Sequence, residues 1–365
     1  MTVSSVVHSA ELTVWLGTSA AKPSEGIYQC TVDSENGKLS QSRLVAPMVG
    51  PGFLALHPKL DVLYAVGGID GKPSVVAYQI VRAAAQPNLE LIGALEIGDG
   101  GATHVSVDAT GRTLLTAQYG GGSVAVFALA PDGSLQKRTG LIAHSGGSQQ
   151  VAGRQDNPHP HWTGFSPDNR FAFVPDLGLD QVVIYKHDAA NSTLTAHGYG
   201  QAPQGGGPRH MRFHPNGRWI FVLNELDLSL SVYDYDAQAG SMTLKQTVPT
   251  EPKADLAKEK SASAAEVCVH PSGKFVYASN RGPDSVTVMA IDQATGRLQV
   301  IEREPIRGAE PRNINLDPSG NWLLAAGQNS HSLASFEVDV QTGELVFSRN
   351  VIPTPSPICI LFDRP

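Results

Sequence analysis

The feature that most constrains the fold is an internal repeat, seen most clearly at residues 207–225. There an apolar run, a His-Pro-Asn-Gly turn beginning at His214 and a second apolar run follow one another. This order is expected of two short strands joined by a tight turn. Five more segments carry the same pattern, with turns that begin at His57, Asp108, Ser166, His270 and Asp317. The chain therefore contains six copies of one supersecondary unit.

Each copy continues into two further strand-like segments. A third segment alternates apolar and polar residues, as in Leu230–Tyr233, and a fourth follows a Gly-x-Leu turn, as in Gly296–Val300. Four strands recurring roughly every fifty residues is the spacing of β-propeller blades rather than of helical solenoids. The 37 glycines and 25 prolines suit many turns. Only the short stretches 81–85 and 257–259 look helical, so an all-β fold is predicted.

The two ends of the chain predict a seventh blade. Leu12–Thr18 and Gly26–Val32 look like the second and third strands of a unit that has no first strand, whereas Ser356–Phe362 looks like a first strand alone. Combined, about residues 10–46 plus 354–363 would close the ring and leave no free sheet edge. Although length alone suggests about two domains, the contiguous repeats predict one domain over residues 1–365: a seven-bladed β-propeller with four antiparallel strands per blade.

Charge and hydropathy exclude several classes of partner. The formal net charge is −7, whereas nucleic-acid-binding proteins present a basic face, so no nucleic acid is expected. No stretch is apolar for long enough to span a bilayer, and Met1–His8 lacks the basic segment and apolar core of a signal peptide. We therefore expect a cytoplasmic protein with no membrane partner, present as a monomer or weak homo-oligomer.

The sequence offers no motif for a metal, a cofactor or a serine nucleophile. Cys30, Cys268 and Cys359 lack metal-ligand spacing and are interpreted as small buried residues. Whether Cys30 and Cys359 interact in the closing blade is left open. The chain has no His-Glu-x-x-His run, no Gly-x-Ser-x-Gly elbow and no cluster of carboxylates suited to calcium. We expect neither a metal nor a cofactor.

The hairpin in each unit separates the polar residues into two groups at opposite ends of the ring. At the turns, the position of His57, His214 and His270 also accepts Asp or Ser, so hydrogen bonding to the turn backbone explains it and we assign it no chemistry. At the other end, here called the mouth, equivalent positions hold different residue types, which a purely structural repeat would not require. The polar residues expected there include His104, His159, His161, Arg209, His210, Glu225, Glu266, Arg281, Arg312 and Gln328.

This composition favours an anionic ligand and acid–base chemistry. Arginine suits a carboxylate or phosphate, and a neutral imidazole suits a general base acting on water. An Arg209–Glu225 pair would equally well tie one blade together, so each single residue also has a structural interpretation. Two inserts, 143–157 and 249–262, should overhang the mouth. We interpret the first as a mobile lid and the second as a solvated loop.

Several motifs resemble those of a known family: Pro158–His161 with Ser166–Arg170, Gly207–His210, Asn224–Leu226, Tyr277–Gly282 and Ala326–Ser330. In this order, and over essentially the whole chain, they resemble the seven-bladed propeller lactonases, which include 6-phosphogluconolactonases and fungal 3-carboxy-cis,cis-muconate lactonising enzymes. The resemblance implies a catalytic set of His161 (or His159), Arg209, Glu225 and Arg281. The remaining mouth residues would then contact the substrate. One departure is Glu266, where phosphogluconolactonases tend to have His.

The resemblance implies metal-independent hydrolysis of a small anionic lactone, 6-phosphogluconolactone to 6-phosphogluconate, a step of the pentose phosphate pathway in carbohydrate metabolism. Water deprotonated by His161 and oriented by Glu225 would attack the ring carbonyl. Arg209 or Arg281 would stabilise the oxyanion, and Arg312 would hold the substrate's anionic group. Two alternatives remain open: a muconate-type cycloisomerase, and a non-catalytic propeller that binds a ligand or serves as a scaffold.

Overall fold

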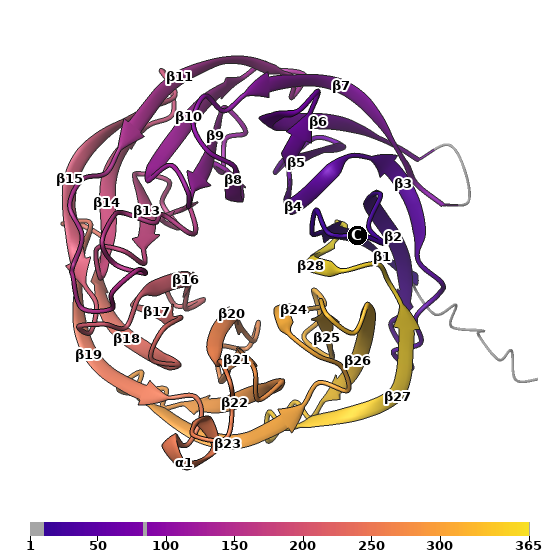
Figure 1. Cartoon of the computed structure of the whole chain (residues 1–365), viewed down its shortest axis with the longest axis vertical. Helices are drawn as coiled ribbons and strands as arrows, with labels where there is room; N and C mark the ends of the chain where they lie inside the picture. The colour runs from indigo at the N-terminus through magenta and orange to yellow at the C-terminus, as the bar shows by residue number, and fades with distance from the viewer. Residues whose placement is uncertain (1–10, 83–85, 365) are drawn as a thin grey trace, which may run out of the picture.

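The computed structural model describes residues 11–82 and 86–364, which form a ring of seven four-stranded antiparallel sheets (Figure 1). In each sheet the first strand lies nearest the axis of the ring and the fourth lies at its outer rim. The seven-bladed β-propeller predicted from the repeat is confirmed. All strands of a blade are neighbours in its sheet, so each hairpin runs from the axis outward.

Six blades are built from consecutive strands. The first two consist of β4 (Val49–Leu56), β5 (Val62–Ile69), β6 (Lys72–Val81) and β7 (Asn88–Glu96), and of β8 (Ala102–Val107), β9 (Thr113–Gln118), β10 (Ser123–Leu129) and β11 (Leu135–Ala143). The next two consist of β12 (Gly164–Phe165), β13 (Phe171–Asp176), β14 (Gln181–Asp188) and β15 (Thr193–Gln201), and of β16 (Pro208–Phe213), β17 (Trp219–Asn224), β18 (Ser229–Asp236) and β19 (Ser241–Pro249). The last two consist of β20 (Ser263–Val269), β21 (Phe275–Arg281), β22 (Ser285–Ile291) and β23 (Leu298–Pro305), and of β24 (Pro311–Leu316), β25 (Trp322–Gly327), β26 (Ser332–Val338) and β27 (Leu345–Pro353).

The seventh blade joins the two chain ends as predicted. Its order is β28 (Pro357–Phe362), β1 (Glu11–Thr18), β2 (Gly26–Asp33) and β3 (Arg43–Pro47). Strand β28 runs antiparallel to β1, with Val14 opposite Phe362 and Leu16 opposite Ile360. Backbone hydrogen bonds between distant parts of the sequence therefore close the ring.

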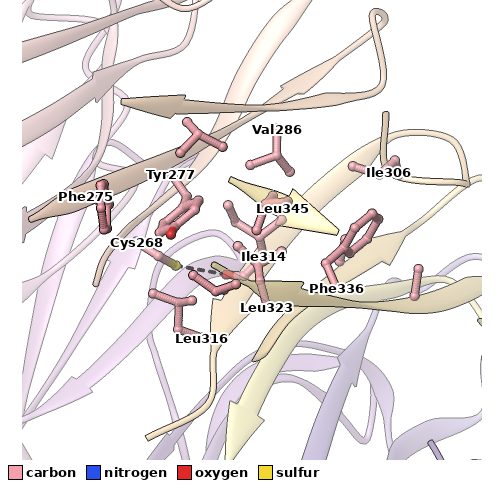
Figure 2. Packing of buried hydrophobic residues seen from close by; sticks show 14 residues of the cluster. Cys268, Phe275, Tyr277, Val286, Ile306, Ile314, Leu316, Leu323, Phe336 and Leu345 are labelled. Carbon is pink, nitrogen blue, oxygen red and sulfur yellow. Dashed lines mark hydrogen bonds between the residues drawn. The ribbon is translucent and has the colours of Figure 1, made fainter. Parts of the chain in front are cut away.

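Neighbouring blades pack through apolar faces. Figure 2 shows one such contact, in which Tyr277 and Val286 of one blade meet Ile314, Leu323 and Phe336 of the next. The thiol of Cys268 reaches across this contact, 3.2 Å from the carbonyl oxygen of Ile314. Close packing of this kind resists small displacements. The blades therefore form a rigid frame for the residues at the axis.

The three turn histidines each tie their own blade to the following one. The Nδ1 atom of His214 accepts the Asn216 N–H at 3.0 Å, so Nε2 carries the proton and donates to the Gly273 carbonyl at 2.8 Å. His57 and His270 make the same two kinds of contact. Gly273 has φ +71°, and a Cβ there would lie 2.7 Å from the His214 ring. The predicted structural role is confirmed, with a link to the next blade added.

The three cysteines are free and buried. Burial raises the pKa of each thiol to about 12, so they are unreactive hydrophobic residues, as the sequence indicated.

The helical expectation near 257–259 is met only by an adjacent short helix, that at Val81 is wrong, and the rest of 81–85 is mostly outside the described residues. The single described helix, α1 (Lys253–Leu256), ends before 257–259. Val81 is the last residue of strand β6, and residues 83–85 lie outside the described part, as does Met1–His8. Within residues 11–82 and 86–364, no helix has the length and apolar character needed to cross a membrane.

Candidate active site

Irregular pairing places the polar residues at the mouth. The first strands β8, β16 and β24 each break register near their mouth end, which leaves Thr103, Arg209 and Arg312 without a partner in the neighbouring strand. A bulge of this kind re-aims the side chain of the extra residue. All three side chains line one cavity near the axis. The bulges are therefore the local feature that builds the site.

Two connected hollows form the site. The first, here called the inner pocket, has a volume of about 110 Å³; its lining includes Phe53, Ile358, Thr103, His161, Arg209, His210 and Arg312. The second, the outer pocket, measures about 380 Å³ and is lined by Thr103, Tyr119, Arg154, His161, Glu225, Ser263, Arg281 and Arg312. Because Thr103, His161 and Arg312 line both, the two pockets adjoin. A larger hollow of about 580 Å³ lies around the His57 turn and contains none of these residues.

Glu225 binds three arginines. Its Oε1 accepts from Arg154 Nη2 at 2.7 Å, and its Oε2 lies 2.8 Å from Arg209 Nε and 3.3 Å from Arg281 Nη2. Burial favours the neutral acid, but the charges of Arg281 and Arg209 outweigh it and hold the pKa of Glu225 well below its ordinary value. Glu225 is therefore a carboxylate that organises the arginines, since both of its oxygens are occupied.

Positive charge exceeds negative charge at this point. Besides Glu225, the described carboxylate at ion-pair distance from the arginines that line the pockets is that of Glu310, 3.8 Å from Arg281 Nη1. Within the part of the chain that the structure describes, Arg312 has no carboxylate partner at ion-pair distance, although it lines both pockets. Burial and the neighbouring Arg281 lower the pKa of Arg312, as expected of a cation that lacks a counter-ion. The site is therefore suited to an anionic ligand.

His161 presents a free imidazole to both pockets. It lies in the segment before β12, where its backbone N–H donates to the Pro175 carbonyl at 3.0 Å. No residue of the described ranges hydrogen-bonds to either ring nitrogen, and Nδ1 is buried. Burial, together with Arg209 and His210, holds the pKa of His161 well below its ordinary value. The ring is therefore neutral near pH 7.

His210 is paired with a buried carboxylate. Its Nδ1 lies 3.0 Å from Glu266 Oε2, and its ring centroid lies 5.1 Å from that of His161. Burial, followed by Arg209 and Arg212, holds the pKa of His210 well below its ordinary value, so this ring is also neutral. Since a carboxylate only accepts, Nδ1 carries the proton and Nε2 has a lone pair. That Nε2 is buried and without a described partner.

Four predicted site residues lie behind or beside the pockets: Glu266, which is buried against His210, and the three described next. His104 packs between Phe53 and Trp162, at ring distances of 4.1 and 5.3 Å, and lines neither pocket. His159 stacks on Tyr119 at 4.3 Å and donates from Nδ1 to the Tyr119 carbonyl at 2.7 Å. Of His159 and His161, only the latter faces the pockets. Gln328 is half-exposed, and its backbone N–H donates to the Glu310 carbonyl.

Repeat-based reasoning missed Arg154, which lies in the insert 143–157. That insert is anchored over the mouth by Gln155, whose buried Nε2 donates to the Leu177 carbonyl at 2.8 Å and to Asp180 Oδ1 at 2.6 Å. The anchor holds the neighbouring Arg154 against Glu225 and 3.3 Å from the Tyr119 hydroxyl. The sequence did offer one indication of this role, because Arg154 is the one arginine in an insert that is otherwise rich in Gly, Ser and Gln.

The insert 249–262 differs in part from its prediction as a solvated loop. Residues 257–261 are exposed, as expected. Glu251 is instead buried, where it accepts from Asn280 Nδ2 at 3.1 Å and from the Ser285 hydroxyl. A buried carboxylate is stable only when it is hydrogen-bonded. These bonds to β21 and β22 therefore hold the start of the insert in place.

Comparisons with known proteins match nearly the whole length of the chain. A family model described as "Lactonase, 7-bladed beta-propeller" matches residues 13–362. The 6-phosphogluconolactonase of Bacillus subtilis is 34% identical over 348 residues, which are 95% of this chain and 97% of that protein. The 6-phosphogluconolactonase of Formosa agariphila is 32% identical, covering 89% of this chain and 91% of that protein. The structure of a periplasmic gluconolactonase from Pseudomonas aeruginosa has a TM-score of 0.89 and 28% identity, covering 97% of this chain and 99% of that one.

Proposed function

Because this chain belongs to the seven-bladed β-propeller lactonase family, we propose that it hydrolyses an anionic sugar lactone, 6-phosphogluconolactone, to the open acid. The observation that carries this proposal is the composition of the inner pocket, where two neutral imidazoles lie beside two guanidinium groups. Ester hydrolysis needs a proton acceptor for water and a cation for the carbonyl oxygen. Both are present within one hollow.

Arg312 is the proposed anchor for the substrate's phosphate. It is half-buried, lines both pockets and has no carboxylate partner at ion-pair distance among the described residues. Arg281 lines the outer pocket beside it. A guanidinium group binds phosphate oxygens through two parallel hydrogen bonds. The outer pocket would therefore hold the phosphate, and the inner pocket would hold the lactone ring.

Arg209 is the proposed donor to the oxyanion. Its Nε binds Glu225 and its Nη1 donates to the Ala265 carbonyl, which fixes the guanidinium in the wall of the inner pocket. Water attacks the lactone carbonyl carbon while one of its protons passes to an imidazole, and the carbonyl electron pair moves onto the oxygen facing Arg209. Collapse of this intermediate breaks the bond to the ring oxygen, which takes the proton back from the imidazolium.

The test compares two lactones and two variants. Initial rates above the spontaneous background are measured with chelator present, on 6-phosphogluconolactone and on unphosphorylated gluconolactone. Arg312→Gln should raise KM for the phosphorylated substrate by about tenfold to a hundredfold, the value of a hydrogen bond to a charged group. The same variant should leave the unphosphorylated substrate unaffected. The exposed Arg170→Gln is the matched control.

Two outcomes would contradict the proposal. If Arg312→Gln raised KM equally for both lactones, Arg312 would not bind the phosphate, and the proposed place of the phosphate in the outer pocket would be wrong. If the wild-type protein hydrolysed neither lactone, the proposed activity would be wrong. Muconate-type diacids would then be tested as substrates, and a non-catalytic binding role would be considered.

A further inference from the structure

We propose that His210, held by Glu266, and not His161, is the base that takes the proton from the attacking water. This inference rests on the lactone hydrolysis proposed above and names its proton acceptor. It reassigns the role that the family motifs suggested for His161, because the two imidazoles differ in their partners.

The carboxylate of Glu266 prepares His210 for this role. It lies 3.0 Å from Nδ1, which fixes the tautomer and leaves the Nε2 lone pair available. Glu266 is itself held by Arg212 Nη2 at 2.9 Å, by Asn313 Nδ2 at 2.6 Å and by the Val267 N–H at 3.0 Å. When Nε2 accepts a proton, the resulting imidazolium faces a fixed negative charge, which is the function of the carboxylate in a Ser-His-Asp triad.

His161 lacks this support. Its Nδ1 is buried and unpartnered among the described residues, so no carboxylate is hydrogen-bonded to the ring or fixes its tautomer. Glu225 lies nearby, but Arg154, Arg209 and Arg281 occupy its oxygens. An imidazolium at His161 would therefore be buried without a counter-charge of its own. We assign His161 to contact with the substrate in its neutral form.

The position of His210 matches the chemistry. His210 and Arg209 are adjacent on the bulged strand β16 and both line the inner pocket. A water molecule at Nε2 would therefore lie close to a carbonyl whose oxygen faces Arg209. In the step, the water O–H bond breaks, Nε2 gains the proton, and the new C–O bond forms as the carbonyl electrons move to oxygen. The imidazolium then returns the proton to the leaving ring oxygen.

The decisive experiment is chemical rescue. His210→Ala and His161→Ala are compared on 6-phosphogluconolactone at saturation, with and without added imidazole. We expect His210→Ala to lose about 10²–10⁴ in kcat, the value of a positioned base, and to regain part of it with imidazole. His161→Ala should mainly raise KM and gain nothing from imidazole. The opposite assignment of loss and rescue would overturn the inference while leaving the proposed function intact, whereas an inactive wild type would overturn both.

A folding control keeps this test decisive. Thermal unfolding is measured for each variant, because both rings are buried. If His210→Ala does not fold, His210→Gln replaces it, since its amide can still donate to Glu266 but cannot accept a proton.

The role of Glu266 as a positioning residue is tested by the pH dependence of kcat/KM. The groups that face His210 are Glu266 on β20, Arg209 and Arg212 on β16, Arg281 on β21, Arg312 on β24, His104 on β8 and His161. Glu266 is the anion paired with the ring, so Glu266→Gln should make the imidazole a weaker base, move the acid limb to lower pH and reduce kcat. An acid limb that does not move would assign Glu266 a purely structural role and overturn the proposed pairing. Glu337→Gln, exposed on β26, is the control.

Discussion

The two ends of the propeller use histidine in opposite ways. At the turn end, His57, His214 and His270 each hydrogen-bond through both ring nitrogens to nearby backbone. At the mouth, His161 uses neither ring nitrogen and His210 uses only one, with the rest unpartnered among the described residues. Buried polar atoms are normally satisfied, and the exceptions require an explanation. Recurrence of a residue type thus marks structure in this ring, whereas histidines that leave a buried ring nitrogen unpartnered among the described residues mark the candidate site.

The arginines sharpen the same contrast. Arg170 pairs with Asp168 at the exposed turn end, where such a pair contributes little. Arg209 and Arg281 are buried at the mouth, where Glu225 is shared with Arg154. Neutralising the carboxylate of an ion pair should therefore lower the unfolding free energy much more at the mouth than at the turn end.

The largest expected effect is that of Glu225→Gln. Loss of the carboxylate leaves Arg209 buried without its counter-charge, which should cost about 3–5 kcal/mol of unfolding free energy. Lactone hydrolysis should also fall by about 10²–10³, since Arg209 is the proposed oxyanion donor. Urea denaturation and initial rates measure the two effects.

The matched control is Asp168→Asn, which disrupts the exposed pair with Arg170. It should change the unfolding free energy by only about 0–1 kcal/mol. Equal losses in the two variants would show that the mouth cluster is an ordinary surface network.

The architecture could be predicted because the repeat is visible as residue patterns. The turn at His214 and its five counterparts locate every first hairpin, and the end segments Leu12–Thr18 and Ser356–Phe362 locate the closing blade. Packing between blades then follows from alternation of apolar residues. A repeated structure is thus encoded many times in the sequence, so that single irregularities do not obscure it.

The site could be predicted only to the level of the mouth. Arg209 and Arg312 occupy equivalent positions in the repeat, and counting from the turn placed both at the correct end. Gln328 occupies the position after the second strand that Glu225 occupies in its own blade, but it does not line either pocket, because the direction of its side chain depends on local backbone geometry that composition does not reveal. Arg154 belongs to no repeat position, and the bond between His210 and Glu266 joins different blades. Such contacts depend on three-dimensional packing.

Acid should destabilise the protein through the mouth histidines. The folded-state pKa values of His104, His161 and His210 lie well below about 6.5, the ordinary value, because burial opposes the charged ring. The unfolded chain therefore binds more protons below that pH, and stability falls as pH decreases, by about 1.4 kcal/mol per pH unit per histidine that stays neutral. The depressed pKa of Glu225 adds a further loss only below about pH 4.3, its ordinary value.

Urea denaturation between about pH 5 and 8 measures this dependence. His161→Gln should reduce the slope below about pH 6.5, because one titrating group is removed. An unfolding free energy that stays constant across this range would show that the mouth histidines are accessible to water and protonate freely in the folded state.

A smaller effect is expected at the turn end. His214→Ala removes the Nε2 donor to the Gly273 carbonyl and the acceptor for the Asn216 N–H, at a cost of about 1–3 kcal/mol. Catalysis should not change, because His214 lies at the opposite end of the ring from the pockets. Thermal unfolding and kcat measured on the same preparation separate the two. A fall in kcat without loss of stability would contradict the assignment of a purely structural role to the histidines at the turn end.

The smallest effect should come from Arg154→Gln, which tests whether the insert belongs to the site. The Arg154 side chain is 41% exposed, so its ion pair with Glu225 is partly screened by water. Stability should therefore change by only about 0–1 kcal/mol. Arg154 also lines the outer pocket, and the loss of one hydrogen bond should raise KM about two- to tenfold with kcat unchanged. The exposed Arg170→Gln is again the control. If both arginine variants leave KM unchanged, the insert only covers the mouth, and the anionic ligand is held entirely by arginines on the blades.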